Sequence, residues 1–598
     1  MLISKWKWTF LLLLTKIVSA QNITHGPMIG GVTENSARIY IRTSSSVNFS
    51  LEYSTDSTFA SFQQINSATD ANLDTSKIVT LENLAIFTDY YFRYRINGNI
   101  ENTIGHFKTF PVVGSAEHLT FVTGSCQETP NMKVFDVMPL YKPILFIHTG
   151  DFTYPSYQIP RYVGMDYPED WSAVKLGWRR RNEEPICKDM LKKIPIAYMP
   201  DDDDTWGNSK YFKGGALQVR YENGKLINYF DLYPRTQQMR TNCLTAYKNF
   251  FPGYQMQNDT DGYYHSFKVG NCEFFMIDVR SCNTGGWNNL KYNAAINLWT
   301  FNGNSPSQTM LNQPQLDWFL NALKNSTATW KFIISGVPFN KNIQPLVELP
   351  LLIQGMQFNI GGYAGTGFRL SYSFSDYFGA YAYERTKILN YIKNNAIKNV
   401  IVISGDTHGC AIDDGTNAGL PEMNASGLSV SSTELYYQFN NVFKVIGLDL
   451  NKWLWNKGGL GIGNNNIKNA FGKMEVFGND SVQLQIVDED NFIVARHTIK
   501  NNNIISGVNN LKVMTDLVSI FPNPASDYIQ IQLNSKYTGE KIQYIKIFDL
   551  NGKEVYQVNI TTPLNDLIET PIQQFSNSTY LISIETDKSF AVQKFVKQ

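Results

Sequence analysis

Four short apolar runs in the middle of the chain have the pattern of strands that are buried on both faces. They are "HLTFVTG", "PILFIHTG", "WKFIISG" and "NVIVISG", and none of them alternates between apolar and polar residues. Strands of a sheet that is covered on both sides have this composition. Between them, "QPQLDWFLNALKN" and "YERTKILNYIKNN" carry apolar residues at helical spacing. We therefore predict a layered α/β domain over residues 113–500.

The segments on either side alternate between apolar and polar residues, as strands with one exposed face do. "ARIYIRT", "NFSLEYS" and "DYYFRYRI" predict an immunoglobulin-like or fibronectin-like β-sandwich over residues 21–112. "IKNNNIISG" contains a linker, placed at 501–510. After it, "DYIQIQL", "YIKIFDL" and "TYLISIE" predict a second small β-sandwich over 511–598, with a tight hairpin turn at Asn551-Gly552. The predicted fold class is α/β, flanked by two small all-β sandwich domains.

The first 20 residues have the features of a secretory signal peptide. Lys5 and Lys7 precede a short apolar core, and small residues end the segment at Ala20. The apolar core is too short to span a bilayer, and no later apolar run reaches the length of about 18 residues that a transmembrane helix needs. We expect an exported protein that begins near Gln21 and has no transmembrane segment; an uncleaved membrane anchor is the alternative.

Composition adds little to this picture. The chain has 52 basic and 52 acidic residues, so its charge gives no argument for binding nucleic acid or an anionic membrane. Six cysteines in 598 residues do not make a disulfide scaffold. In an exported protein, however, Cys187, Cys243, Cys272 and Cys282 could pair.

The run "MPDDDDTWGN" places four aspartates, Asp201 to Asp204, directly after the apolar segment "IPIAYM". Neighbouring carboxylates repel one another, so the run needs neutralisation. A solvated acidic turn is one interpretation, and a bound cation is the other. Because the run follows a predicted strand, it lies where α/β enzymes tend to place their sites.

Three other predicted strands end in a glycine followed by a residue that can bind a metal. These ends are Gly124-Ser125-Cys126-Gln127, Gly150-Asp151 with Tyr154 close behind, and Gly405-Asp406-Thr407-His408. Each residue alone has an ordinary structural explanation, such as a buried thiol or a turn carboxylate. His148 points away from Asp151 in strand phase, and we interpret it as structural. Together, the strand ends predict a two-metal hydrolytic site with carboxylate, phenol, thiolate and imidazole ligands.

The order of these motifs resembles that of the alkaline phosphatase D type of metallophosphatase, a secreted phosphomonoesterase and phosphodiesterase. The resemblance covers residues from about 24 to 500 and begins with "HGPMIGGVTENSARIYIRT". It continues through "GSCQ", "HTGDFTY", "PDDDDTWGN", "EFFMIDVRS", "QLDWF", "GAYAYERTKIL" and "ISGDTH". It implies the layered metallophosphoesterase sandwich as the fold of the α/β domain.

The resemblance also implies a ligand set. Cys126, Asp151 and Tyr154 would bind Fe³⁺, with Asp151 as the bridging ligand. Asp202 and Asn208 would bind a second metal, and Asp406 and His408 would close the cluster. Family members of this type bind iron and calcium, so the resemblance implies Ca²⁺ as the second metal. Ca²⁺ suits this sequence because hard cations take oxygen ligands. Arg280 and Arg385 are candidates either for phosphate contact or for core salt bridges.

One position departs from the family pattern. Relatives carry a histidine, which contacts the substrate phosphate or protonates the leaving group, where this chain has Asp203. We count Asp203, with Arg280, as a candidate catalytic residue. We expect a metal to neutralise Asp202, and backbone amides or water to neutralise Asp201 and Asp204; Asp203 has no assigned partner. The predicted function is hydrolysis of small-molecule or polymeric phosphate esters. The alternative is a non-catalytic calcium-binding surface protein that keeps the fold.

The C-terminal region resembles a type A sorting domain of the type IX secretion system. "SIFPNPASDYIQIQL", "IKIFDLNGKEV" and the closing "VQKFVKQ" carry this resemblance. It implies that the type IX machinery is a partner and that the protein is secreted or held at the cell surface. A generic β accessory domain is the alternative.

Overall fold

The computed structural model describes most of the chain between residues 22 and 598. The predicted signal peptide and nearly all of the predicted linker lie outside the described residues, as do Asn208 and the Asn551-Gly552 turn. The described ranges are 22–127, 132–154, 169–205, 236–258, 260–285, 289–293, 298–341, 374–416, 418–428, 468–501, 517–537, 540–549, 554–560, 567–586 and 589–598, with short pieces at 220–222, 225–227, 344–348, 351, 357–360, 363–366, 371 and 512–513.

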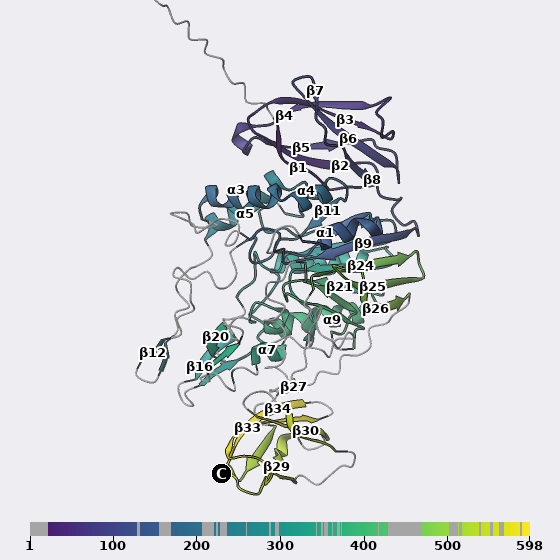
Figure 1. Ribbon diagram of the computed structural model, residues 1–598. Helices are drawn as coiled ribbons and strands as arrows, with labels where there is room; N and C mark the ends of the chain where they lie inside the picture. The colour runs from purple at the N-terminus through teal and green to yellow at the C-terminus, as the bar shows by residue number, and fades with distance from the viewer. Residues whose placement is uncertain are drawn as a thin grey trace, which may run out of the picture.

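The central part of the protein is built on two sheets that pack face to face (Figure 1). The first has the strand order β26-β25-β24-β9-β10-β11-β1-β2-β5, and the second has the order β14-β15-β18-β21-β23-β22. The central strands are β9 (His118–Gly124), β10 (Leu145–His148), β11 (Ile196–Tyr198), β14 (His265–Val269), β15 (Cys272–Ile277), β18 (Trp330–Ser335), β21 (Val400–Ser404), β22 (Cys410–Asp413), β23 (Glu422–Ala425), β24 (Ala470–Phe477), β25 (Ser481–Asp488) and β26 (Ile493–Lys500).

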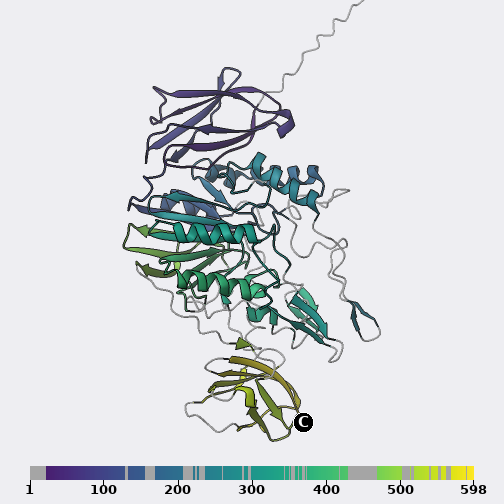
Figure 2. The same ribbon diagram turned by 180° about the vertical axis from the view of Figure 1, so that it is seen from behind.

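Strands β15, β18 and β21 of the second sheet are buried on both faces, as their continuous apolar runs predict. Phe274 of β15 packs against Phe121 of the first sheet, with ring centroids 5.1 Å apart. The next residue, Phe275, points the other way and packs on Phe319 of helix α6. The same alternation continues in β18 and β21, whose residues divide between two apolar cores. Helices α6 (Gln313–Asn325) and α9 (Ala382–Asn394) cover this outer face (Figure 2).

Helices also pack on β11 of the first sheet. The Trp178 ring of α3 lies 6.1 Å from the Tyr198 ring of β11, and Tyr247 of α5 donates a hydrogen bond to the Tyr198 carbonyl oxygen. The protein is therefore layered, with helices outside two central sheets. The remaining described helices in this part are α1 (Val134–Val137), α3 (Trp171–Glu183), α4 (Pro185–Leu191), α5 (Gln237–Phe250) and α7 (Gln344–Glu348).

The N-terminal β module is continuous with the first central sheet. Its strands β1 (Ile23–Gly30), β2 (Ala37–Thr43) and β5 (Ser76–Leu81) extend that sheet, because β1 pairs in parallel with β11 at Gly30 and Ile196. A Cβ atom at Gly30 would lie 2.5 Å from the Pro252 carbonyl oxygen, so the junction requires glycine. The second sheet of this module contains β3 (Asn48–Ser54), β4 (Gln63–Ala68), β6 (Asp89–Ile96), β7 (Asn99–Ile100) and β8 (Gly105–Lys108).

The C-terminal β module has its own apolar core between two sheets and lies at the bottom of Figure 1. One sheet has the order β27-β34-β33-β30-β31, and the other has the order β28-β29-β32. These strands are β27 (Lys512–Val513), β28 (Val518–Phe521), β29 (Tyr528–Leu533), β30 (Ile542–Phe548), β31 (Glu554–Asn559), β32 (Leu567–Pro571), β33 (Ser578–Thr586) and β34 (Ser589–Lys597).

The cysteines do not form the pairs that the sequence allowed. Cys243, Cys272 and Cys282 are free thiols in the structure, and the side chain of Cys187 lies outside its described part. The three thiols have different neighbours. Cys243, for example, donates a hydrogen bond to the Thr205 carbonyl oxygen. Among the described residues, every helix is too short or too polar to span a bilayer.

Candidate metal centre

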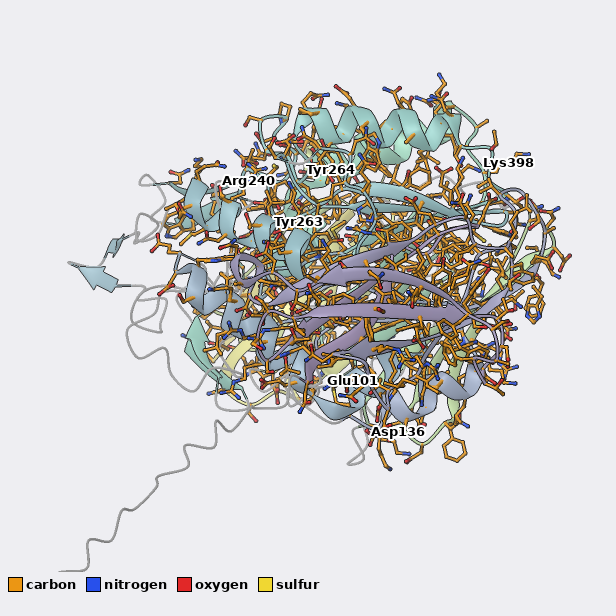
Figure 3. The ribbon with its side chains drawn as sticks, turned by 90° about the horizontal axis from the view of Figure 1, so that it is seen from above. Glu101, Asp136, Arg240, Tyr263, Tyr264 and Lys398 are labelled. Atoms are coloured by element: carbon orange, nitrogen blue, oxygen red, sulfur yellow. The ribbon has the colours of Figure 1, made fainter. Side chains whose placement is uncertain are left out.

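The carboxyl ends of parallel strands from both sheets meet at one edge of the sandwich. Strands β9, β10 and β11 run parallel in the first sheet, and β15, β18 and β21 run parallel in the second. Figure 3 shows the carboxyl ends of these strands on the side of Arg240, Tyr263 and Tyr264. Lys398, which precedes β21, lies on the opposite side. Residues that follow these strands are therefore brought together although they lie far apart in the sequence.

Two groups of potential ligands form at this edge. One contains Cys126, Asp151, Asp406 and His408, and their ligand atoms all lie within 4.8 Å of one another. The other contains Asp151, Asp201, Asp202 and Asp406. Asp151 and Asp406 belong to both groups, so two carboxylates, rather than one, are placed where they could serve both halves of the site.

The first group is tied together by direct contacts. The Tyr154 hydroxyl donates to Asp151 Oδ2 at 2.8 Å, and Cys126 Sγ lies 3.7 Å from the same oxygen. Asp151, Cys126 and Tyr154 are all at most 2% exposed. The structure thus brings together Cys126, Asp151, Tyr154, Asp202, Asp406 and His408 of the predicted ligands, while Asn208 lies outside the described residues.

The backbone at these ligands is held in an uncommon conformation. Cys126, Asp151, Asp406 and His408 have φ angles of 61°, 58°, 65° and 54°. Non-glycine residues rarely adopt this left-handed region, and such strain clusters at functional sites. Gly150 precedes Asp151 with φ of 113°, and a Cβ atom there would lie 2.3 Å from Asp201 Cβ. The turn after β10 therefore needs glycine both for its backbone angle and for space.

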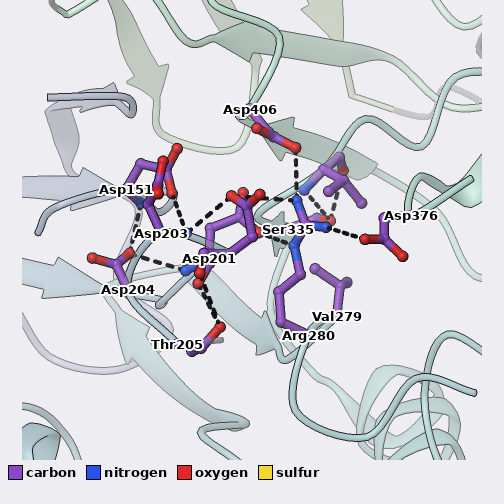
Figure 4. Close-up of polar contacts among 12 residues, drawn as sticks. Asp151, Asp201, Asp203, Asp204, Thr205, Val279, Arg280, Ser335, Asp376 and Asp406 are labelled. Carbon is purple, nitrogen blue, oxygen red and sulfur yellow. Dashed lines mark hydrogen bonds and ion pairs between the residues drawn. The ribbon is translucent and has the colours of Figure 1, made fainter. Parts of the chain in front are cut away.

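Asp201 and Asp204, the first and last aspartates of the acidic run, are neutralised in different ways (Figure 4). Asp204 is buried, and it accepts the main-chain amides of Asp151, Thr153 and Asp201 at 2.6, 2.6 and 3.0 Å. This confirms the expectation of backbone amides for Asp204. For Asp201 that expectation was wrong, because its carboxylate is paired with the Arg280 guanidinium.

Arg280 is the cationic centre of the second group. Its guanidinium donates to Asp406 Oδ2 at 2.6 Å and to Asp201, and it lies 3.9 Å from Asp202 Oδ1 and 3.8 Å from Asp376 Oδ2. It is only 1% exposed. Burial alone would lower the pKa of Arg280, but the surrounding carboxylates raise it well above its ordinary value. Arg280 is thus a buried salt-bridge residue in this structure. Arg385 is also buried, with Glu422 and Glu348 as its charged neighbours.

The Arg280 guanidinium is a single positive charge among several buried carboxylates, and it pairs with Asp406 and Asp201. Burial, followed by the charges of Asp202 and Asp203, raises the pKa of Asp151 well above its ordinary value. Burial likewise raises the pKa of Asp406, and the carboxylates of Asp202 and Asp201 add to it. Buried carboxylates this close cannot all ionise without further cations.

The thiol of Cys126 is subject to the same two effects, burial and nearby negative charge. Burial, with Asp151 and Asp406 nearby, raises its pKa well above the ordinary value. A thiol needs a bound metal to lose its proton in such a place. The donor set of carboxylates, phenol, thiol and imidazole therefore fits metal ions.

Asp203 borders the ligands without belonging to either group. It is 8% exposed, and its main-chain amide donates to Asp151 Oδ1 at 3.2 Å. Its charge contributes to the raised pKa values of Asp151 and Tyr154. His148 is fully buried and packs against Phe152 and Tyr198.

A family model described as PhoD-like phosphatase matches residues 121–440, more than half of the chain. The chain belongs to the PhoD-like phosphatase family. A second model, described as the PhoD-like phosphatase N-terminal domain, matches residues 13–111. A third, described as a secretion system C-terminal sorting domain, matches residues 519–598. Both resemblances drawn from the sequence are confirmed.

Among proteins similar to this PhoD-like chain is alkaline phosphatase D from Bacillus subtilis (strain 168). The two are 24% identical over 334 residues, which cover 53% of this chain and 51% of that protein. The chain thus spans about half the length of this curated relative. A solved structure described as "Structure of PhoD" has a TM-score of 0.56 and 16% identity, covering 80% of this chain and 92% of that one. This likeness confirms the predicted fold class.

Sequence reasoning named Arg280 as a candidate for a core salt bridge but missed its partner. Asp201 and Arg280 pair across 79 positions, and no local pattern reveals such a pair. It also missed two residues that support the ligands rather than bind a metal. Ser426 and Asn424 in "EMNASG" lie against the ligand loops. The only available signal was their position at the end of a short strand, which is too weak to single them out.

Proposed function

We propose that this protein is an exported, metal-dependent phosphoesterase that hydrolyses small-molecule or polymeric phosphate esters. The observation that carries the proposal is the convergence of Cys126, Asp151, Asp406 and His408 within 4.8 Å at the shared carboxyl edge of two sheets. Membership of the PhoD-like phosphatase family supports the same chemistry.

The proposed ligands divide between two metals. Cys126, Asp151 and Tyr154 would hold Fe³⁺, because a thiolate and a phenolate among carboxylates suit that ion. Asp202 would hold the second metal together with Asn208, and Asp406 and His408 would complete the cluster. Ca²⁺ is proposed for the second position on account of its oxygen donors. Bound there, the two cations would supply Lewis acidity toward a phosphate ester and would activate the attacking water.

The chain's own residues would prepare this site. Asp151 would orient both halves of the cluster, since it belongs to both ligand groups. Arg280 would hold Asp406 and Asp201 in place. A direct contact between Arg280 and phosphate, as a catalytic role requires, would need one of these ion pairs to open, at a cost set by the buried charge left behind. Asp203 would face the substrate in place of the family's histidine.

Metal analysis coupled to a substrate panel tests the proposal. The full-length protein is assayed for metals and for hydrolysis of p-nitrophenyl phosphate and bis(p-nitrophenyl) phosphate, before and after chelation. We expect about one iron per chain, activity that is lost on metal removal, and recovery when iron and calcium are restored. Activity in an iron-free preparation would reject iron. A metal-loaded protein that hydrolyses neither ester would favour the rival, a calcium-binding surface protein that keeps the fold.

Export is the second part of the proposal. The C-terminal sorting domain indicates secretion or display at the cell surface. We propose that residues 1–20 direct the chain out of the cytoplasm and that the type IX machinery recognises residues 511–598. Cell fractionation with an antibody against the central domain tests this route. Full-length protein that remains inside cells with a working type IX system would contradict it.

A further inference from the structure

The hydroxyl of Ser426 lies between two of the proposed metal ligands. Ser426 Oγ is 2.9 Å from Cys126 Sγ, and it accepts a hydrogen bond of 3.0 Å from the His408 main-chain amide. Cys126 follows a strand of the first sheet, while His408 follows a strand of the second. One buried side chain therefore connects ligand loops from the two sheets.

The direction of these hydrogen bonds follows from their chemistry. A main-chain N–H can only donate, so Ser426 Oγ is the acceptor toward His408. The single hydroxyl proton of Ser426 is then available to donate to Cys126 Sγ. Ser125 Oγ also approaches this sulfur, but at 3.5 Å, and Oγ of Ser125 accepts the Asp406 amide at 3.4 Å. Ser426 is thus the closest hydroxyl to the sulfur among the described contacts.

The segment that carries Ser426 is firmly attached to the ligand loop. Two residues earlier, the Asn424 side-chain amide donates to the Gly405 carbonyl oxygen at 2.7 Å, and its oxygen accepts from the Thr407 hydroxyl at 2.6 Å. Ser426 itself donates its main-chain amide to the Gly409 carbonyl oxygen. These contacts fix Ser426 relative to the loop that carries Asp406 and His408, so its hydroxyl is preorganised toward the sulfur.

We propose that Ser426 is a positioning residue for the metal ligand Cys126. It donates a hydrogen bond to the ligand sulfur. By also accepting one from the His408 amide, it holds the two ligand loops in a fixed position relative to each other. The inference rests on the proposed function in one respect, which is that iron is bound by Cys126. It adds to that function a residue that tunes the iron–sulfur bond without touching the metal.

A hydrogen bond to a thiolate withdraws electron density from the sulfur. The sulfur then donates less strongly to the metal, which raises the reduction potential of the metal and shifts sulfur-to-metal charge transfer to higher energy. Loss of the Ser426 hydroxyl should have the opposite effect. Partners of this kind are also worth about 10–100-fold in metal affinity.

The test compares three full-length variants with the wild type. Ser426→Ala removes the hydroxyl, and Ser426→Thr keeps it. Ser281→Ala is the matched control, because it also deletes a buried hydroxyl near the site, but one that makes no hydrogen bond within the described part of the chain. The readouts are iron per chain after dialysis, the position of the visible charge-transfer band, and the reduction potential of the iron.

For Ser426→Ala we expect about 10-fold weaker iron retention, a charge-transfer band at longer wavelength and a lower reduction potential. Ser426→Thr and Ser281→Ala should behave like the wild type. A Ser426→Ala protein that matches Ser281→Ala in all three readouts would overturn the inference while leaving the iron assignment intact. Wild-type protein without iron would overturn both.

A measurement on the wild-type protein covers the case in which Ser426→Ala fails to fold. Resonance Raman spectra of the iron–sulfur stretch are recorded in H₂O and in D₂O. A hydroxyl that donates to the sulfur predicts a shift of this band on exchange. An unshifted band would overturn the proposal without any variant.

Discussion

The carboxylate of Asp204 accepts a 2.6 Å hydrogen bond from the main-chain amide of Asp151. The last aspartate of the acidic run thereby fixes the backbone of a proposed metal ligand 53 positions away. It also accepts from the Thr153 amide and hydroxyl. The run is therefore not a uniform acidic surface, since its fourth member is structural and its first is neutralised by Arg280.

Asp204→Ala should destabilise the protein strongly. Several buried amides would lose their acceptor, and each unsatisfied group costs about 1–3 kcal/mol. We expect a loss of at least about 3 kcal/mol in the free energy of unfolding, with a smaller loss for Asp204→Asn, which keeps one acceptor oxygen. Urea unfolding of metal-free protein measures both. Asp56→Ala is the control, because Asp56 accepts amides of Thr58 and Ala60 in an exposed loop. Equal losses for Asp204→Ala and Asp56→Ala would contradict the assigned role.

Asp151→Asn should abolish hydrolysis while the protein still folds. The substitution keeps the size of the side chain but removes a charge that both ligand groups share, so iron content should fall together with turnover. Activity on p-nitrophenyl esters and elemental analysis give the two readouts. Asp136→Asn, on the exposed side of α1 and labelled in Figure 3, should leave both unchanged. Turnover above about a tenth of the wild type would reject the bridging role, since lesser supporting residues already give 10–100-fold effects.

Asp203 should make the enzyme sensitive to substrate charge. A monoester at pH 8 carries nearly two negative charges and a diester carries one. At about 4 Å and an effective dielectric near 20, each extra charge costs on the order of 4 kcal/mol before screening. We expect diesters to be preferred, and Asp203→His to raise kcat/KM for monoesters more than for diesters.

Asp203→Asn separates the two explanations for such a change. If repulsion dominates, Asn and His should both shift the monoester-to-diester ratio; if proton donation dominates, only His should. An unchanged ratio in both variants would mean that Asp203 does not face the substrate.

Glu384 provides a pH-dependent prediction away from the metal centre. Burial raises its pKa to about 7, although its carboxylate accepts the amides of Met310 and Leu311. The folded pKa lies above the unfolded value of 4.5. The contribution of Glu384 to stability is therefore full below about pH 4.5 and is lost as the pH rises through 7.

Glu384→Gln keeps the accepting oxygen without the titration. Relative to the wild type it should gain stability between pH 5 and pH 8, by up to about 3 kcal/mol. Urea unfolding at the two pH values measures the difference. A difference between variant and wild type that stays the same at both pH values would show that Glu384 does not titrate in this range.

The sequence predicted the elements that depend on local pattern. Runs such as "WKFIISG" form strands that are buried on both faces. Because both faces of such a strand pack against apolar layers, its sequence is a continuous apolar run. Cys126, Asp151 and Asp406 could be grouped in advance because each follows such a strand, and parallel strands end at a common edge.

Interactions between residues that are far apart in the sequence produce no such local pattern. The pairing of Arg280 with Asp201 depends on the registration of two sheets, which nothing near either residue encodes. Ser426 was missed because serine after a short strand is common and carries no chemical signature of its own. The join between β1 and β11 was missed because the alternating pattern of the N-terminal strands fits a separate sandwich equally well.

The pairing of β1 with β11 determines where the chain can be cut into parts that fold independently. Because β1 lies alongside β11 in one continuous sheet, a chain shortened to begin near residue 112 would leave the backbone of β11 without its neighbour. An open edge of this kind invites pairing with other molecules. The N-terminal strands and the metal-binding half should therefore melt as one cooperative unit, and an exchange of the N-terminal module between relatives would succeed only if the junction around Gly30 and Ile196 were carried along.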